Sequence, residues 1–240
     1  RIRAIADEMG YKPNQLGRAL SMSRNNIKIG VILQGAETPF MKEVLKGIQE
    51  ACAEVDNLGG TVLVHKIEHQ NAEDVIRAME KMRMEEVSGI AMVPLDEESV
   101  KREIDRFVEE LRIPVVTFTS DVEDTKRLCF VGQNGVQCGR AAAGLMGELT
   151  GGKGKVAVIS GYSTNTSLSS RVTGFREEMV RKYPGIEIIG PEYCFEENGR
   201  AREITEGIFK EVPDLDGIYL TSHGEEGVCE AIAGEGKLVR

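Results

Sequence analysis

The stretch VVTFTSDVEDTKRLCFV, which runs from Val115 to Val131, breaks the rhythm of an otherwise regular α/β pattern. Val115–Phe118 is a short apolar run typical of a buried strand, and Leu128–Val131 is a second one. The polar segment Thr119–Arg127 between them shows no helical periodicity. Because two strands follow each other here without a helix, we expect the chain to leave one sheet for another at this point. The sequence therefore predicts two lobes rather than one long sheet.

On both sides of this break, apolar β-branched runs alternate with amphipathic segments. Apolar strands of this kind are typical of parallel sheets covered by helices on both faces. The repeated order of strand and helix requires right-handed crossovers, so each lobe is predicted to be a doubly wound α/β unit. The strands are expected at Ile29–Leu33, Val62–Ile67, Gly89–Val93, Val115–Phe118, Lys155–Ser160, Ile186–Ile189 and Gly217–Thr221. The helices are expected at Met41–Val55, Ala72–Met84, Val100–Leu111, Gly135–Leu149, Ser169–Lys182, Ala201–Lys210 and Glu225–Ala233.

The first 28 residues do not follow this repeat. Ile2–Met9 is a helical pattern that ends at Gly10, a residue favoured after helix ends. Pro13-Asn14 then interrupts the chain, and a short helix is expected over Gln15–Ser21 with the asparagine as its N-cap. Because Gly17 lies inside this short helix, it needs a packing partner to be stable.

Charge is unevenly spread along the chain. The net charge is −9, with 30 basic and 39 acidic residues among 240. The first 28 residues hold six basic and two acidic side chains, a net charge of +4, so the remaining residues together carry −13. A basic end on an acidic body indicates that this end binds a polyanion such as DNA. Short basic ends are also common in proteins that bind no polyanion, and that alternative stays open at this point.

Composition disfavours several functional classes. No apolar stretch is close to the ~18 residues of a membrane span, and the chain does not begin with the layout of a secretory signal. The five cysteines form no C-x-x-C pair, which argues against disulfides and zinc and fits a cytoplasmic location. The Gly151–Gly154 turn is no phosphate loop, since its lysine is not followed by Ser or Thr. Without a catalytic motif, the sequence predicts no enzyme, no cofactor and no metal.

A series of motifs resembles the lactose-repressor family of transcription regulators. The N-terminal motif is Gly10-Tyr-Lys-Pro-Asn-Gln-Leu-Gly-Arg-Ala-Leu20, which is followed by Ile29-Gly-Val-Ile. The others are Thr38-Pro-Phe40, Phe130-Val-Gly-Gln-Asn134 with Gly139-Arg140, and Ser170-Arg171 with Gly174-Phe175. Their order and spacing span nearly the whole chain.

The resemblance implies a two-lobed, periplasmic-binding-protein-like fold of type I. It would be preceded in the chain by the last part of a helix-turn-helix headpiece. Residues 1–28 would be the headpiece remnant and hinge helix, residues 29–133 the first lobe, and residues 134–240 an incomplete second lobe. The helix-turn-helix itself would precede Arg1, and the closing strands would follow Arg240.

The resemblance also assigns DNA contacts to the hinge helix. Leu20 stands where the family inserts a leucine into the minor groove. Arg18 is expected to contact phosphate, and Asn14 to cap the helix or reach the DNA backbone. Judged on these residues alone, a linker helix with one buried leucine explains them as well.

For the ligand, the resemblance points to the strand-to-helix loops, where α/β sheets bind small molecules. Arg171 would donate to adjacent sugar hydroxyls in fixed geometry, although a solvated arginine would be unremarkable there. Phe40, with Thr38 beside it, would stack on the apolar face of a sugar ring, unless it is a core residue. Phe195 is the corresponding aromatic candidate in the opposing lobe.

Two further loops depart from the family pattern. Many members carry an aspartate at the position of Thr119, so Ser120 and Asp121 are expected to share its role of accepting from sugar hydroxyls. Ser222 is a candidate contact where the family often has Asn-Asp. These departures leave the sugar unidentified. Asp96 is expected to cap the next helix rather than line the cleft, and Asn134 to be structural.

The sequence thus predicts a repressor whose dimer changes its affinity for operator DNA when a sugar or polyol binds, either as inducer or as co-repressor. The alternative is an extracytoplasmic sugar-binding protein of a transport system. That class shares the lobes but not Gly10–Leu20.

Overall fold

The computed structural model describes residue 5, residue 9, residues 27–67, residues 71–236 and residue 239. Asn14, Arg18 and Leu20, the three predicted DNA contacts, lie outside these residues, as do the hinge helix and most of the first predicted helix. The described chain folds into two compact units. The first unit contains the described residues up to Met92, together with Glu103–Val116 and Lys126–Leu128. The second unit contains Val93–Arg102, Thr117–Thr125 and the described residues from Cys129 onward. Short segments therefore alternate between the units, where the sequence predicted a single boundary after residue 133.

A five-stranded sheet with the order β2-β1-β3-β4-β5 forms the first half of the fold. β1 pairs in parallel with both β2 and β3, and the middle of β1 is buried, as expected for a central strand covered on both faces. The strands are β1 (Lys28–Gln34), β2 (Thr61–Ile67), β3 (Gly89–Met92), β4 (Val115–Phe118) and β5 (Cys129–Val131). The helices are α3 (Pro39–Asn57), α4 (Ala72–Met84) and α5 (Glu98–Glu109).

Two local expectations are corrected here. The run Leu128–Val131 does not start a new sheet, because β5 lies beside β4 at the edge of the first one. Backbone bonds from Leu128 N to the Val115 carbonyl (2.7 Å) and from Thr119 N to the Val131 carbonyl (3.1 Å) fold the polar segment back on itself. Asp96 is not a helix cap either, since α5 begins only at Glu98.

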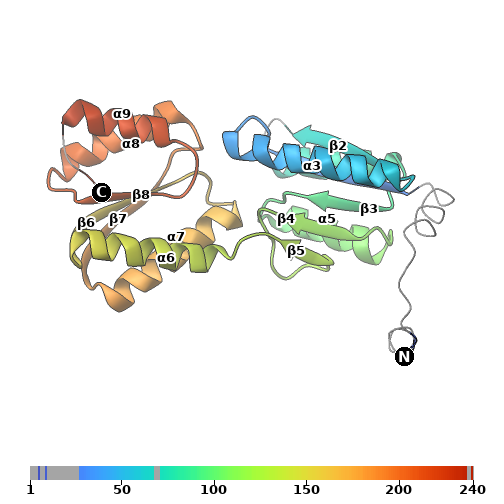
Figure 1. The fold of residues 1–240 in the computed structure, drawn as a ribbon, viewed down its shortest axis with the longest axis horizontal. Helices are drawn as coiled ribbons and strands as arrows, with labels where there is room; N and C mark the ends of the chain where they lie inside the picture. The colour runs from blue at the N-terminus through green and yellow to red at the C-terminus, as the bar shows by residue number, and fades with distance from the viewer. Residues whose placement is uncertain (1–4, 6–8, 10–26, 68–70, 237–238, 240) are drawn as a thin grey trace. The chain divides into compact units, whose positions relative to one another are not determined.

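The second unit is a three-layer α/β arrangement around the strand order β7-β6-β8. All pairings in this sheet are parallel. In Figure 1, α6 and α7 cover one face of these strands and α8 and α9 the other. The strands are β6 (Lys153–Ser160), β7 (Gly185–Tyr193) and β8 (Gly217–Leu220). The helices are α6 (Gly135–Thr150), α7 (Thr166–Lys182), α8 (Asn198–Glu211) and α9 (Glu225–Glu235). The predicted fold class is confirmed.

Alternation along β6 explains why helices cover both faces. Val156 and Val158 pack into an apolar cluster with α6 and α7, whereas Ala157 and Ile159 pack into a second cluster with α8 and α9. All four side chains are completely buried. Because successive side chains of a strand point to opposite faces, an uninterrupted apolar strand needs a covering layer on each side. Among the described helices, none is long and apolar enough to cross a membrane.

Glycines let α6 and α7 cross closely. A Cβ atom at Gly139 would collide with the Arg171 carbonyl oxygen, and one at Gly174 would collide with the Val136 carbonyl oxygen. Both obstacles are backbone atoms, so neither can rotate away. The crossing therefore fixes the backbone of α7 at Arg171 relative to the start of α6.

We predict that Gly139→Ala destabilises the protein by about 1–3 kcal/mol. The added methyl group would overpack the contact between α6 and α7, where the obstacle is backbone that cannot rotate away. Gly144→Ala in the same helix is the matched control. A Cβ there meets nothing within 4 Å, so it is expected to stabilise by about 0.5–1 kcal/mol through helix propensity. Urea unfolding measures both changes, and equal effects of the two variants would contradict the crossing described here.

Candidate functional site

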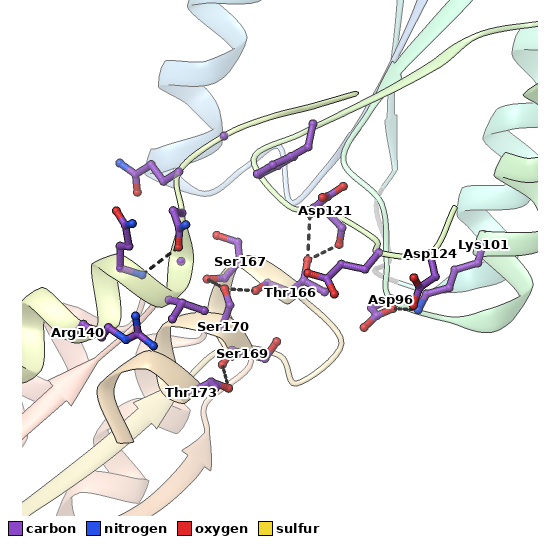
Figure 2. A pocket seen from close by; sticks show the side chains of 18 residues that line it. Asp96, Lys101, Asp121, Asp124, Arg140, Thr166, Ser167, Ser169, Ser170 and Thr173 are labelled. Atoms are coloured by element: carbon purple, nitrogen blue, oxygen red, sulfur yellow. Dashed lines mark hydrogen bonds and ion pairs between the residues drawn. The ribbon is translucent and has the colours of Figure 1, made fainter. Parts of the chain in front are cut away.

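A pocket of about 810 Å³ opens within the second unit. Its lining is mostly hydrogen-bonding side chains from four places: the loop after β3 with the start of α5, the segment after β4, the end of β5, and the first turns of α6 and α7 (Figure 2). The residues that line it are Asp96, Lys101, Asp121, Glu123, Asp124, Phe130, Gly132, Gln133, Asn134, Gly135, Val136, Gln137, Arg140, Thr166, Ser167, Ser169, Ser170 and Thr173.

Asparagine caps fix the helix starts at the pocket. Asn134 Oδ1 accepts from Gln137 N at 3.0 Å, and Asn165 Oδ1 accepts from Ser167 N at 3.0 Å. Asparagine is among the preferred N-cap residues because its side chain satisfies an otherwise unpaired N–H of the first turn. The structural role expected for Asn134 is confirmed. The positive ends of two helix dipoles therefore face the same space and favour ligand groups that accept hydrogen bonds.

Thr166, the first residue of α7, ties the segment after β4 to this helix. Its hydroxyl lies 2.9 Å from Ser120 Oγ, accepts from Asp121 N at 3.0 Å and donates to the Asp121 carbonyl oxygen. Ser120 is only 1% exposed. Its hydroxyl thus builds the wall, whereas the Asp121 side chain lines the pocket and accepts from the Thr117 hydroxyl at 2.7 Å.

The charges around the pocket are predominantly acidic. Lys101 pairs with Asp96 at 2.7 Å, and this bond, together with the charges of Glu98 and Asp124, raises the pKa of its ammonium group. Arg140 pairs with Glu177 of α7 at 2.9 Å. Because the carboxylates of Asp121, Glu123 and Asp124 also line the space, an anionic ligand is disfavoured.

A second group of candidate ligand residues lies at the carboxyl edge of the β7-β6-β8 sheet. We call Arg171, Gln133, Phe195 and Ser222 the strand-end cluster. The Arg171 guanidinium donates to the Thr221 carbonyl oxygen at 2.9 Å and to Gln133 Oε1 at 3.2 Å. A guanidinium carries five N–H donors, so two contacts of this kind hold it in place and leave it able to donate to a ligand. Gln133 belongs both to this cluster and to the pocket lining.

Phe195 holds an unusual backbone conformation in this cluster. Phe195 and Glu196 have φ values of 55° and 62°, in the left-handed region that costs side-chain-bearing residues on the order of 1–3 kcal/mol. The Phe195 ring is 47% exposed and packs against Tyr162 with centroids 5.5 Å apart. Burial, followed by the charges of Glu196 and Glu197, raises the pKa of the Tyr162 hydroxyl. Strain of this kind is common at binding sites.

Gly161 brings the Phe195 loop and Ser222 together. Phe195 N donates to the Gly161 carbonyl oxygen at 3.3 Å, and a Cβ at Gly161 would lie 3.1 Å from Ser222 Oγ. Ser222 itself donates to the His223 carbonyl oxygen at 3.3 Å. Arg171 of α7 and the two predicted residues that follow strands, Phe195 and Ser222, therefore lie at one edge of this sheet.

The remaining predicted ligand residues lie in the first unit, after β1. Thr38 caps α3: its hydroxyl accepts from Met41 N at 3.3 Å and donates to the Gly35 carbonyl oxygen at 3.0 Å. Phe40 lies in the first turn of α3 and is 62% exposed. An exposed ring at a strand-to-helix junction is available to a ligand and does not belong to the core.

Sequence reasoning missed most of the large pocket. Of the seven predicted ligand residues, only Asp121 lines it. Tyr162 and Thr166 carried no signal of their own, because their partners are distant in the sequence. In the part of the chain that the structure describes, no three His, Cys, Asp or Glu side chains are placed to hold a metal ion. What both sites offer is hydrogen bonding to a polar ligand.

Comparison with known proteins agrees with this fold. The model of the periplasmic binding protein domain matches residues 29–239. The chain belongs to this family. The ribose import binding protein RbsB of Bacillus subtilis is 21% identical over 229 residues, which cover 94% of this chain and 70% of RbsB. The ribose operon repressor of Escherichia coli is 24% identical over 206 residues, which cover 83% of this chain but only 58% of the repressor.

Solved structures show the same likeness. The glucose-galactose binding protein GanP of Geobacillus stearothermophilus superposes with a TM-score of 0.79 at 25% identity, covering 88% of this chain and 74% of GanP. A solute binding protein from Burkholderia graminis in complex with D-arabinose also gives a TM-score of 0.79, at 26% identity, covering 86% of this chain and 70% of that protein. The likeness therefore extends over both units.

We predict that Thr166→Val destabilises the protein by about 1–3 kcal/mol, because it removes a hydroxyl that satisfies partly buried groups of Ser120 and Asp121. Thr173→Val is the matched control in the same helix and pocket, since the Thr173 hydroxyl only bonds back to the Ser169 carbonyl oxygen at 3.1 Å. Its effect is expected within about 0.5 kcal/mol. Denaturant unfolding of the two variants checks the difference.

Proposed function

We propose that this chain is the sensor of a DNA-binding transcription regulator, a repressor that responds to a neutral sugar or polyol. One observation carries the proposal: the motif Gly10–Leu20 stands directly before the family domain of residues 29–239. By the resemblance, transport binding proteins share the lobes but not this segment. The similarity to the ribose operon repressor supports the same role. The regulator is expected to act as a homodimer on operator DNA in the cytoplasm.

The residues of the second unit support a neutral polyhydroxylated ligand. Arg171 and the capped helix ends donate hydrogen bonds, and the carboxylates of Asp121 and Asp124 accept them. Phe195 offers a partly exposed aromatic ring at the same edge of the sheet as Arg171. Sugars present both hydroxyls and an apolar face, so this combination suits them. GanP and RbsB, which are named for glucose, galactose and ribose, support this ligand class.

The effector acts by binding two conformations of the sensor with different affinity, since only such a difference shifts an equilibrium. In the DNA-bound state, Asn14, Arg18 and Leu20 engage the operator. Ligand binding and release suffice for this role, and no covalent step is part of it.

A transport role is the second candidate. RbsB is similar over 94% of this chain, and the sugar-binding structures share its fold. A transport binding protein would bind its sugar with the same residues but would respond to no DNA.

The two candidates differ in the coupling between ligand and DNA. With the complete gene product, we expect at least one monosaccharide or polyol, titrated calorimetrically, to change operator affinity by about 5–150-fold. Leu20→Ala is expected to weaken operator binding and leave sugar affinity unchanged. If the sugar binds equally well with and without DNA, and DNA affinity never changes, the regulator is excluded and the transport role remains.

Arg171→Ala tests the ligand site separately. Losing a charged donor to sugar hydroxyls is expected to weaken affinity by about 10–100-fold, which corresponds to the worth of a hydrogen bond to a charged group. Arg200→Ala is the control, because Arg200 pairs only with Glu203 on the surface of α8 in the described structure. Sugar affinity equal to that of the unchanged protein in Arg171→Ala, with its fold intact by circular dichroism, would remove Arg171 from the site.

A further inference from the structure

A second pocket, of about 530 Å³, lies in the first unit between the end of β2 and one face of α4. β2 contributes His65, Lys66 and Ile67. The helix contributes residues at three- and four-residue spacing, which places them on one face. These residues are Asp74, Arg77, Ala78 and Lys81.

This pocket is basic in a protein whose net charge is −9. Three cations line it, Lys66, Arg77 and Lys81, against the single carboxylate of Asp74. Arg77 is neutralised, because it pairs with Asp74 at 3.0 Å and with Glu73 at 2.9 Å. Within the described ranges, neither lysine has a carboxylate at ion-pairing distance. The Lys81 ammonium group thus lies next to His65 in this pocket, and Lys66 also lines it.

His65 lies next to one of these cations. Its Nδ1 lies 3.4 Å from the Lys81 ammonium nitrogen. Partial burial, followed by the charge of Lys81, lowers the pKa of the imidazole. At neutral pH the ring is therefore uncharged and its Nδ1 accepts from the ammonium group. An anion placed between the cations would reverse this preference, because it stabilises the imidazolium form.

We propose that this pocket binds a small oxyanion, a phosphate or the phosphoryl group of a small metabolite, between Lys66, Lys81 and His65. The three side chains supply several N–H donors around one cavity, and a phosphate offers a matching set of acceptor oxygens. The site lies in the first unit and does not depend on the proposed function.

The test is an NMR titration of the histidine Hε1 protons in the 240-residue chain, at low ionic strength, with inorganic phosphate as the probe. The chain contains only three histidines, and His65→Gln assigns the resonance. We expect phosphate to raise the pKa of His65 saturably. Lys81→Met is expected to weaken the apparent phosphate affinity about tenfold, since it removes one of the two lysines that line the pocket. Lys210→Met, an exposed lysine of α8, is expected to change it less than twofold.

Three outcomes would overturn the proposal. Sodium chloride at matched ionic strength could raise the pKa of His65 as much as phosphate does, which would indicate simple screening of Lys81. Lys81→Met and Lys210→Met could weaken binding equally, which would indicate a nonspecific charge effect. A short DNA duplex could shift His65 where phosphate does not, which would assign the surface to nucleic acid instead. Titration with acetate then distinguishes a phosphate site from a general carboxylate site.

Discussion

The second unit depends on the double burial of β6. Its four central side chains alternate between the α6–α7 cluster and the α8–α9 cluster, and each is removed from water. An apolar strand of this kind is stable only when helices cover both faces, so α6 to α9 must pack where they do. Parallel connections then bring the starts of the helices to the same edge as the ends of β6, β7 and β8. The polar residues after the strands are concentrated there as a consequence.

Close packing of α6 against α7 gives the pocket at this edge its defined shape. Because Gly139 and Gly174 let α6 and α7 approach to backbone contact, the first turns of both helices open into one pocket. Thr166 then holds the segment after β4 against α7 through Ser120 and Asp121. Gln133 connects this pocket to the Arg171 side chain. A ligand that engages Gln133 would therefore alter the support of Arg171, which links the two groups of polar residues physically.

The two pockets differ in the charge of the side chains that line them. The pocket at α6 and α7 is lined by more carboxylates than cations and suits a neutral donor-rich ligand, whereas the pocket at β2 and α4 is lined by more cations than carboxylates. Both lie in the same acidic chain, so net charge alone would have predicted only the first. Burial, followed by the charge of Lys81, lowers the pKa of His65 in the second pocket.

The sequence by itself determined the secondary structure and its class. Strand and helix positions follow from the apolar periodicity, which is local, whereas the capping roles of Thr38 and Asn134 came from the structure. The sequence also singled out Arg171 at the start of a helix, and Phe195 and Ser222 after strands, as separate ligand candidates. Only the tertiary structure decided that β5 joins the first sheet, that Thr166 meets Ser120 across 46 positions, and that Lys81 faces His65. Such contacts depend on how distant segments pack, and periodicity carries no information about which side chains then meet.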